Sequence, residues 1–207
     1  MQIIIPMSGF GERFRKAGYN LPKPLIIVDG KPIIQHVVEM FPGVREISFI
    51  CNKDHLNNPE YDMENILKRI APEGNIVAIN PHKLGPVHAV LESLNEIDLE
   101  KPTIVNYADF TCDWNYIEFL NMVEDSRCDG AIPCYRGFHP HTLWSNYYAY
   151  VREEKMRAWD IQEKKPFTNL PRNEFASSGT YYFRSGNIMS QYFERCVQEN
   201  LTVGGEY

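Results

Sequence analysis

The sequence has no run of about 18 apolar residues, which is the length that a membrane-spanning helix usually needs. It also has no basic segment followed by an apolar stretch and a cleavage site, and no lipidation motif. These absences argue against membrane and secretory classes of protein. We therefore expect a cytoplasmic protein with no membrane partner.

Paired cysteines and a basic surplus are also missing. The five cysteines are widely spaced without a C-x-x-C pair, so neither a disulfide framework nor a zinc knuckle is indicated. His139-Pro140-His141 is the only histidine pair at a ligand spacing, and such a pair is more typical of packing than of a zinc site. Lys and Arg number 21 against 27 Asp and Glu, for a net charge of −6. Because nucleic-acid backbone requires a basic face, we expect no nucleic-acid partner.

The positive charge that exists is concentrated near the N-terminus. Residues 1–31 carry five basic and two acidic side chains, a net charge of +3, so the rest of the chain carries −9. This distribution indicates a small anionic ligand bound by the N-terminal segment.

The N-terminal segment lacks the two commonest phosphate-binding patterns. It has no Walker motif, and Phe14 stands where a dinucleotide fingerprint would have its third glycine. Instead, an apolar segment at 2–7 leads into a glycine loop and two basic residues. A strand that ends in glycines exposes backbone N–H groups to an anion, so these residues predict a triphosphate cradle. The cradle residues are Met7, Ser8, Gly9, Gly11, Glu12, Arg13 and Lys23.

Strands and helices are expected to alternate up to about residue 135. Repeated βαβ units predict a three-layer α/β/α fold with a mainly parallel sheet and ligands at the carboxyl ends of its strands. Beyond this point we expect a small antiparallel extension, closed by a helix, and a single domain over residues 1–207. The expected strands are 2–7, 46–51, 75–79, 103–107, 131–134, 147–152, 158–162 and 179–183, and the expected helices are 32–41, 66–70, 86–94, 113–123 and 185–199.

A second chemical site is expected where the strand at 103–107 ends. Asp109 follows this strand and would lie on the same rim as the glycine loop, since parallel strands point the same way. Its carboxylate is our candidate ligand for Mg²⁺. Asp113 is assigned instead to the N-cap of the next helix, which is the usual role of an aspartate at such a point.

The pattern G-x-G-x-R, eight residues and then P-K-P, which spans Gly9 to Pro24, resembles the signature of the nucleotidyltransferase family that makes activated sugars and related phospho-metabolites. This resemblance implies a Rossmann-like fold, Mg²⁺ as cofactor and Asp109 as its ligand. It further implies that Arg13 contacts the leaving β- and γ-phosphates and that Lys23 contacts the α-phosphate. Gly85 and Pro86 match the loop that holds the base in this family, and Gly85 would permit close approach of a flat ring. A plain connection between a strand and a helix is the open alternative for these two residues.

Two later segments resemble the part of the family that binds the acceptor. Glu163-Lys164-Lys165-Pro166 is similar to an E-K-P element, and residues 176–183 are similar to a strand of pattern A-x-x-G-x-Y-x-F. The extra lysine leaves the choice between Lys164 and Lys165 open, and E-K-K-P by itself is typical of an exposed turn. The residues implied for acceptor binding are Asp109, Glu163, Lys164, Lys165, Ser178 and Gly179.

Within the family, residues 9–26 are similar to the cytidylyltransferases of capsular phosphoramidate synthesis. This implies CTP as donor and L-glutamine phosphate as acceptor, with pyrophosphate released. Two alternatives stay open, a sugar-1-phosphate nucleotidyltransferase using UTP, GTP or dTTP, and a nucleotide-sensing domain without turnover; a homodimer is also left open. The family continues beyond Tyr207, so we expect a C-terminal truncation and name no second metal ligand.

Overall fold

The computed structural model describes residues 1–139 and 148–207, which form two compact units. The first unit comprises Met1–Ala131 and Tyr182–Tyr207, and the second comprises Ile132–Tyr181. His141 of the H-x-H pair lies outside the described residues. The expectation of one domain over 1–207 stays a prediction.

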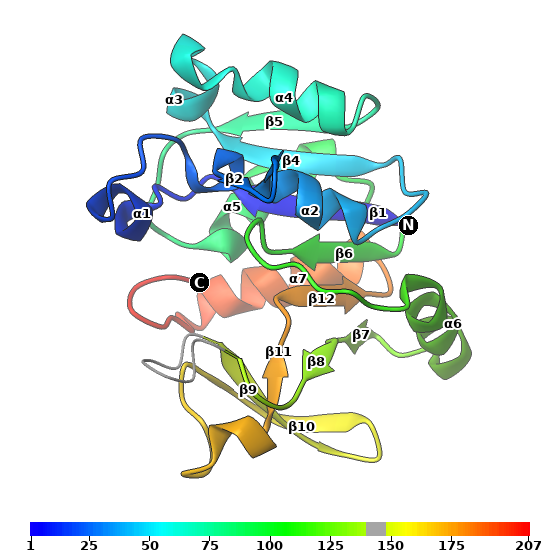
Figure 1. Cartoon of the computed structure of the whole chain (residues 1–207). Helices are drawn as coiled ribbons and strands as arrows, with labels where there is room; N and C mark the ends of the chain where they lie inside the picture. The colour runs from blue at the N-terminus through cyan, green and yellow to red at the C-terminus, as the bar shows by residue number, and fades with distance from the viewer. Residues whose placement is uncertain (140–147) are drawn as a thin grey trace. The chain divides into compact units, whose positions relative to one another are not determined.

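The sheet of the first unit has the strand order β5-β4-β1-β6-β12-β7 (Figure 1). β1 pairs in parallel with β4 and with β6, and β4 pairs in parallel with β5. β12 and β7 pair antiparallel. The expected α/β fold with a mainly parallel sheet is therefore confirmed. The strands are β1 Gln2–Met7, β4 Ile47–Asn52, β5 Asn75–Ile79, β6 Thr103–Asn106, β7 Gly130–Ala131 and β12 Thr180–Phe183.

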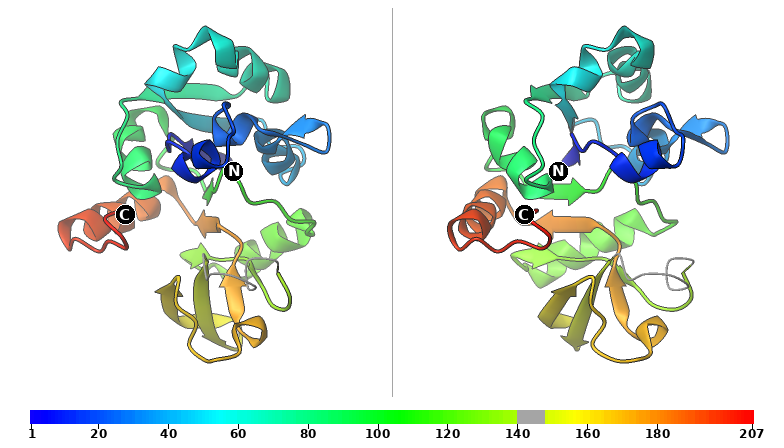
Figure 2. Two further views of the ribbon diagram at one scale, coloured as in Figure 1. Left: turned by 60° about the vertical axis from the view of Figure 1, so that its left-hand side comes forward. Right: turned by 90° about the vertical axis from the view of Figure 1, so that its left-hand side faces the viewer.

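Side chains of β1 alternate between two apolar layers, one on each face of the sheet. Ile3 and Ile5 belong to the layer that includes residues of α2, α4 and α6, whereas Ile4 belongs to the layer that includes residues of α5 and α7. This alternation follows from the two-residue period of a strand. Figure 2 shows α5 and α7 together on one side of the sheet. The helices are α1 Glu12–Lys16, α2 Ile33–Glu39, α3 Lys53–Leu56, α4 Met63–Ile70, α5 Pro86–Glu92, α6 Tyr116–Ser126 and α7 Gly186–Gln198.

The second unit contains an antiparallel sheet of order β10-β9-β11-β8, in which β9 and β10 correspond to the strands expected at 147–152 and 158–162. The strand expected at 179–183 and the helix expected at 185–199 were wrongly placed in this extension, because β12 lies in the six-stranded sheet and Met189 of α7 packs against that sheet. β9 pairs with β10 and with β11, and β11 pairs with β8. Among the described residues of the whole chain, no helix combines the length and apolar character that crossing a membrane requires. The strands are β8 Cys134–Tyr135, β9 Ala149–Glu154, β10 Arg157–Glu163 and β11 Phe175–Ser177.

Two further local expectations were wrong. α6 begins at Tyr116 and its N-cap is Asn115, whose side chain accepts a hydrogen bond from the Glu118 N–H, so Asp113 is not the cap. Trp114 explains the later start, because its Nε1 donates to the Met40 carbonyl at 2.9 Å and this contact fixes the chain before the helix begins. The strand expected over 131–134 is divided between β7 and β8, which belong to different sheets.

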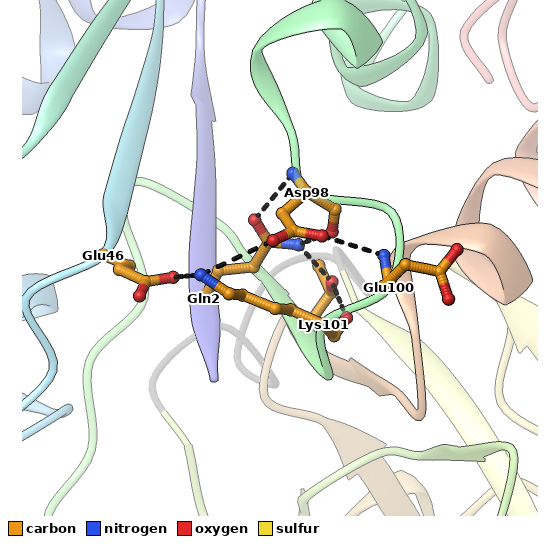
Figure 3. Close-up of polar contacts among 6 residues, drawn as sticks. Gln2, Glu46, Asp98, Glu100 and Lys101 are labelled. Carbon is orange, nitrogen blue, oxygen red and sulfur yellow. Dashed lines mark hydrogen bonds and ion pairs between the residues drawn. The ribbon is translucent and has the colours of Figure 1, made fainter.

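The end of the sheet opposite the glycine loop is held by a polar network (Figure 3). Gln2 is 7% exposed, and its Nε2 donates to the Asp98 carbonyl at 2.5 Å and to Thr103 Oγ1 at 2.8 Å. Its Oε1 accepts from the Asp98 N–H at 3.3 Å. Lys101 adds exposed ion pairs to Glu46 and Asp98. Gln2 thus ties β1 to the segment that precedes β6.

Replacing Gln2 with alanine is expected to lower the free energy of unfolding by about 1–3 kcal/mol, because the buried Thr103 hydroxyl and the partly buried backbone N–H and carbonyl of Asp98 would lose this partner. Chemical denaturation of both proteins measures this difference. Lys101→Ala is the control, since exposed ion pairs contribute little, and it should change stability much less. Equal effects of the two variants would contradict the importance given to Gln2.

Candidate active site

The glycine loop begins where β1 ends and leads directly into α1. Ser8 is buried, and its carbonyl accepts a hydrogen bond from Asn52 Nδ2 at 3.3 Å, so the loop is attached to the end of β4. Gly11 is the N-cap of α1 with φ +62°, a left-handed conformation that favours glycine. Gly9 has open space where a Cβ would point. The loop therefore leaves room for a ligand beside Gly9.

α1 has no buried residue and is held by side-chain contacts. The Arg15 guanidinium lies 3.5 Å from Nε2 of His55, a buried residue of α3. Burial, together with the charge of Arg15, lowers the pKa of His55. Arg13 is exposed on the same helix. α1 is thus a surface element whose basic side chains are accessible.

Lys23 and Asp109 meet in the structure. Lys23 Nζ lies 2.6 Å from Asp109 Oδ2, and their side chains are 23% and 37% exposed. Lys23 begins a short 3-10 helix, Lys23–Leu25, that is anchored by the buried side chain of Leu25. Asp109 follows β6, the parallel neighbour of β1. The fold therefore brings a cation and a carboxylate together, both accessible to solvent.

Gly85 and Pro86 begin α5, but the open side of Gly85 is occupied. Gly85 has φ +91°, and a Cβ there would lie 2.8 Å from the backbone nitrogen of Tyr207 and still closer to its carbonyl oxygen. The Tyr207 N–H donates to the Leu84 carbonyl at 2.8 Å, and the Val87 N–H donates to the Tyr207 carbonyl at 3.4 Å. The space that we expected a flat base to use at Gly85 is thus filled by the backbone of Tyr207.

The expected acceptor residues belong to the second unit, apart from Asp109. Glu163 ends β10, and its Oε1 lies 3.6 Å from Lys164 Nζ, while Lys165 is exposed. Ser178 is 3% exposed, and its Oγ has no hydrogen-bond partner in the described part of the chain. Gly179 has φ +72° and donates its N–H to Ser177 Oγ at 3.1 Å. The buried, unpaired hydroxyl of Ser178 is therefore the polar group of this set that most needs a partner.

The family profile described as Nucleotidyl transferase matches residues 2–202. The chain belongs to the nucleotidyl transferase family. The matched residues include the glycine loop, Lys23 and Asp109. The individual roles of these residues stay predictions.

One relative of this nucleotidyl transferase is named as a bifunctional protein. The chain is 33% identical over 109 residues to the bifunctional protein GlmU of Ralstonia nicotianae, a match that covers 53% of this chain and 22% of GlmU. The chain thus spans about a fifth of the length of that relative.

Solved structures show the same fold at low sequence identity. A nucleoside-diphosphate-sugar pyrophosphorylase from Vibrio cholerae RC9 matches with a TM-score of 0.68 and 19% identity, over 98% of this chain and 79% of that one. HddC from Yersinia pseudotuberculosis, complexed with GMP-PN, matches with a TM-score of 0.65 and 21% identity, over 92% and 79%. At these identities the likeness establishes the fold of this nucleotidyl transferase and leaves its substrates to be proposed.

Three residues near the glycine loop of this nucleotidyl transferase were missed by sequence reasoning. Asn52 and His55 anchor the loop and α1, and Lys83 forms an ion pair with Glu12. Asn52 follows a run of apolar residues in β4, and a polar residue at that strand end was a usable signal. A single lysine in a loop, such as Lys83, carries no comparable signal.

Proposed function

We propose that this nucleotidyl transferase joins CTP to a small phosphorylated acceptor, L-glutamine phosphate, in capsular phosphoramidate synthesis. The observation that carries the proposal is the pair of Lys23 and Asp109, which follows from the fold and provides a cation and a carboxylate on one rim. CTP and L-glutamine phosphate are supported by the resemblance of residues 9–26 to capsular cytidylyltransferases.

The proposed reaction needs no nucleophile from the protein. An oxygen of the acceptor phosphate attacks the α-phosphorus of CTP, the bond from that phosphorus to the bridging oxygen breaks, and pyrophosphate leaves. Catalysis of phosphoryl and nucleotidyl transfer depends mainly on positioning and on neutralising negative charge. Backbone N–H groups at Gly9 and Gly11 would bind the triphosphate, Arg13 its β- and γ-phosphates, and Lys23 the α-phosphate.

The residues present fit Mg²⁺. Asp109 offers an accessible carboxylate, and a magnesium ion at a nucleotide site is commonly held by one or two carboxylates together with phosphate oxygens. In the described part of the chain no three His, Cys, Asp or Glu side chains converge on a possible metal position. When bound, the ion would neutralise phosphate charge, and Asp109 would hold it.

A sugar-1-phosphate nucleotidyltransferase is the second candidate, because the relatives named above include a nucleoside-diphosphate-sugar pyrophosphorylase. Lys164 or Lys165, Glu163, Ser178 and Gly179 are proposed to bind the acceptor in either case. A cytoplasmic location and a homodimer stay predictions.

Pyrophosphate release tests the two candidates directly. The purified chain is incubated with Mg²⁺ and CTP, UTP, GTP, ATP or dTTP, each combined with L-glutamine phosphate, phosphocholine or a sugar-1-phosphate. Release with CTP and L-glutamine phosphate supports the cytidylyltransferase, whereas release only with a sugar phosphate supports the second candidate. Triphosphate binding without release for any acceptor would favour a nucleotide-sensing domain.

A further inference from the structure

Lys83 reaches the glycine loop from a distant part of the chain. It lies between β5 and α5, and its Nζ is 2.6 Å from Glu12 Oε1 and 5.7 Å from the centre of the Phe10 ring. Phe10 and Glu12 flank Gly11, so the ammonium group lies directly beside the backbone that is proposed to hold the triphosphate.

Stability does not explain this ion pair. The side chains of Lys83 and Glu12 are 70% and 56% exposed, and exposed pairs contribute little to folding. The backbone around Lys83 is fixed independently, because His82 Nδ1 accepts from the Leu84 N–H at 3.1 Å and the Leu84 carbonyl accepts from the Tyr207 N–H at 2.8 Å. These backbone hydrogen bonds thus hold the loop that carries Lys83 in place without the ion pair to Glu12.

The charges of Lys83 and Glu12 affect how an anion binds beside them. Glu12 lies in the first turn of α1, and its pKa is lowered by the hydrogen bond and charge of Lys83, so the carboxylate is ionised. An unneutralised carboxylate here would repel a triphosphate bound at Gly9 and Gly11. The Lys83 ammonium cancels this charge and keeps further N–H donors for phosphate oxygens.

We propose that Lys83 is an additional residue of the triphosphate site, which neutralises Glu12 and donates to the phosphate chain of the ligand. The inference rests on the proposed function, because it assumes that the glycine loop binds a triphosphate. It assigns a binding role to a residue outside the glycine loop and the P-K-P segment.

Calorimetric titration of the full chain with CTP, CMP and inorganic tripolyphosphate tests the proposal. Lys83→Ala should weaken binding of CTP and tripolyphosphate by about tenfold or more, the range expected for a lost charged hydrogen bond, and should affect CMP much less. Adding Glu12→Gln to Lys83→Ala should recover most of the affinity that Lys83→Ala loses, because the second change removes the carboxylate that Lys83 neutralises. Lys68→Ala, which breaks the exposed pair with Glu64 on α4, is the matched control and should leave all three affinities unchanged.

Several results would overturn the proposal. Equal weakening of CTP and CMP would show that Lys83→Ala merely displaces the loop. A double variant that binds CTP as weakly as Lys83→Ala would exclude charge neutralisation, and so would unchanged tripolyphosphate binding by Lys83→Ala. If the unmodified protein binds tripolyphosphate and not CTP, the proposed donor fails while this inference holds; if it binds neither, the inference fails.

Discussion

Replacing Lys23 with alanine is expected to lower the rate of pyrophosphate release by about 10²–10³-fold, the usual loss when one preorganised charge-stabilising donor is removed. The side chain is held 2.6 Å from Asp109 on the rim beside the glycine loop, and its proposed partner is the α-phosphate at which the bond is exchanged. Steady-state kinetics with saturating CTP and acceptor measure the change.

The Lys23 variant is also expected to fold normally. Lys23 interacts through a partly exposed ion pair, whereas its segment is anchored by the buried Leu25, so removal of the ammonium should leave thermal unfolding nearly unchanged. Lys68→Ala, which removes an exposed lysine on α4, should keep full activity. Turnover of Lys23→Ala equal to that of the unmodified protein would contradict the assignment.

The parallel strands β1, β4, β5 and β6 were predictable because each contains a cluster of apolar residues. β5 has the predicted bounds, and β4 and β6 differ from the prediction by one residue at one or both ends. α1 was not predicted, since it has no buried residue and hence no apolar period to detect. The N-cap of α6 was misplaced by two residues because both Asp113 and Asn115 are good capping residues. Trp114, which lies between them, packs against Phe41 with the ring centroids 6.0 Å apart, and this contact favours the later start.

The candidate site was only partly predictable, because some of its contacts join distant segments and leave no local sequence pattern. Asp109 could be placed near the glycine loop because parallel strands share a rim. The contacts of Lys83 with Glu12 and of Tyr207 with Gly85 join segments far apart in the sequence, and neither contact leaves a local pattern. Sequence motifs identify individual residues of the site, whereas contacts between distant loops depend on the tertiary structure.

Replacing Asp109 with asparagine is expected to lower activity by at least about 10²-fold, because the amide keeps the size of the side chain and loses the charge that would hold Mg²⁺. Activity is measured against Mg²⁺ concentration. Asp113→Asn is the matched control, since this exposed aspartate forms no hydrogen bond or ion pair within the described ranges 1–139 and 148–207. Loss of activity in Asp113→Asn and not in Asp109→Asn would move the proposed metal ligand from Asp109 to Asp113.

The dependence on Mg²⁺ also separates two roles of Asp109, which could either hold the metal or only orient Lys23. Lys23 neutralises the same carboxylate at 2.6 Å and so competes with a cation for it. If Asp109 holds Mg²⁺, Asp109→Asn should raise the concentration needed for half-maximal activity, and Lys23→Ala should lower it. If Asp109 only orients Lys23, both variants should lose activity with an unchanged Mg²⁺ requirement. Opposite shifts in the two variants therefore identify the carboxylate as the ligand, independently of how much activity each retains.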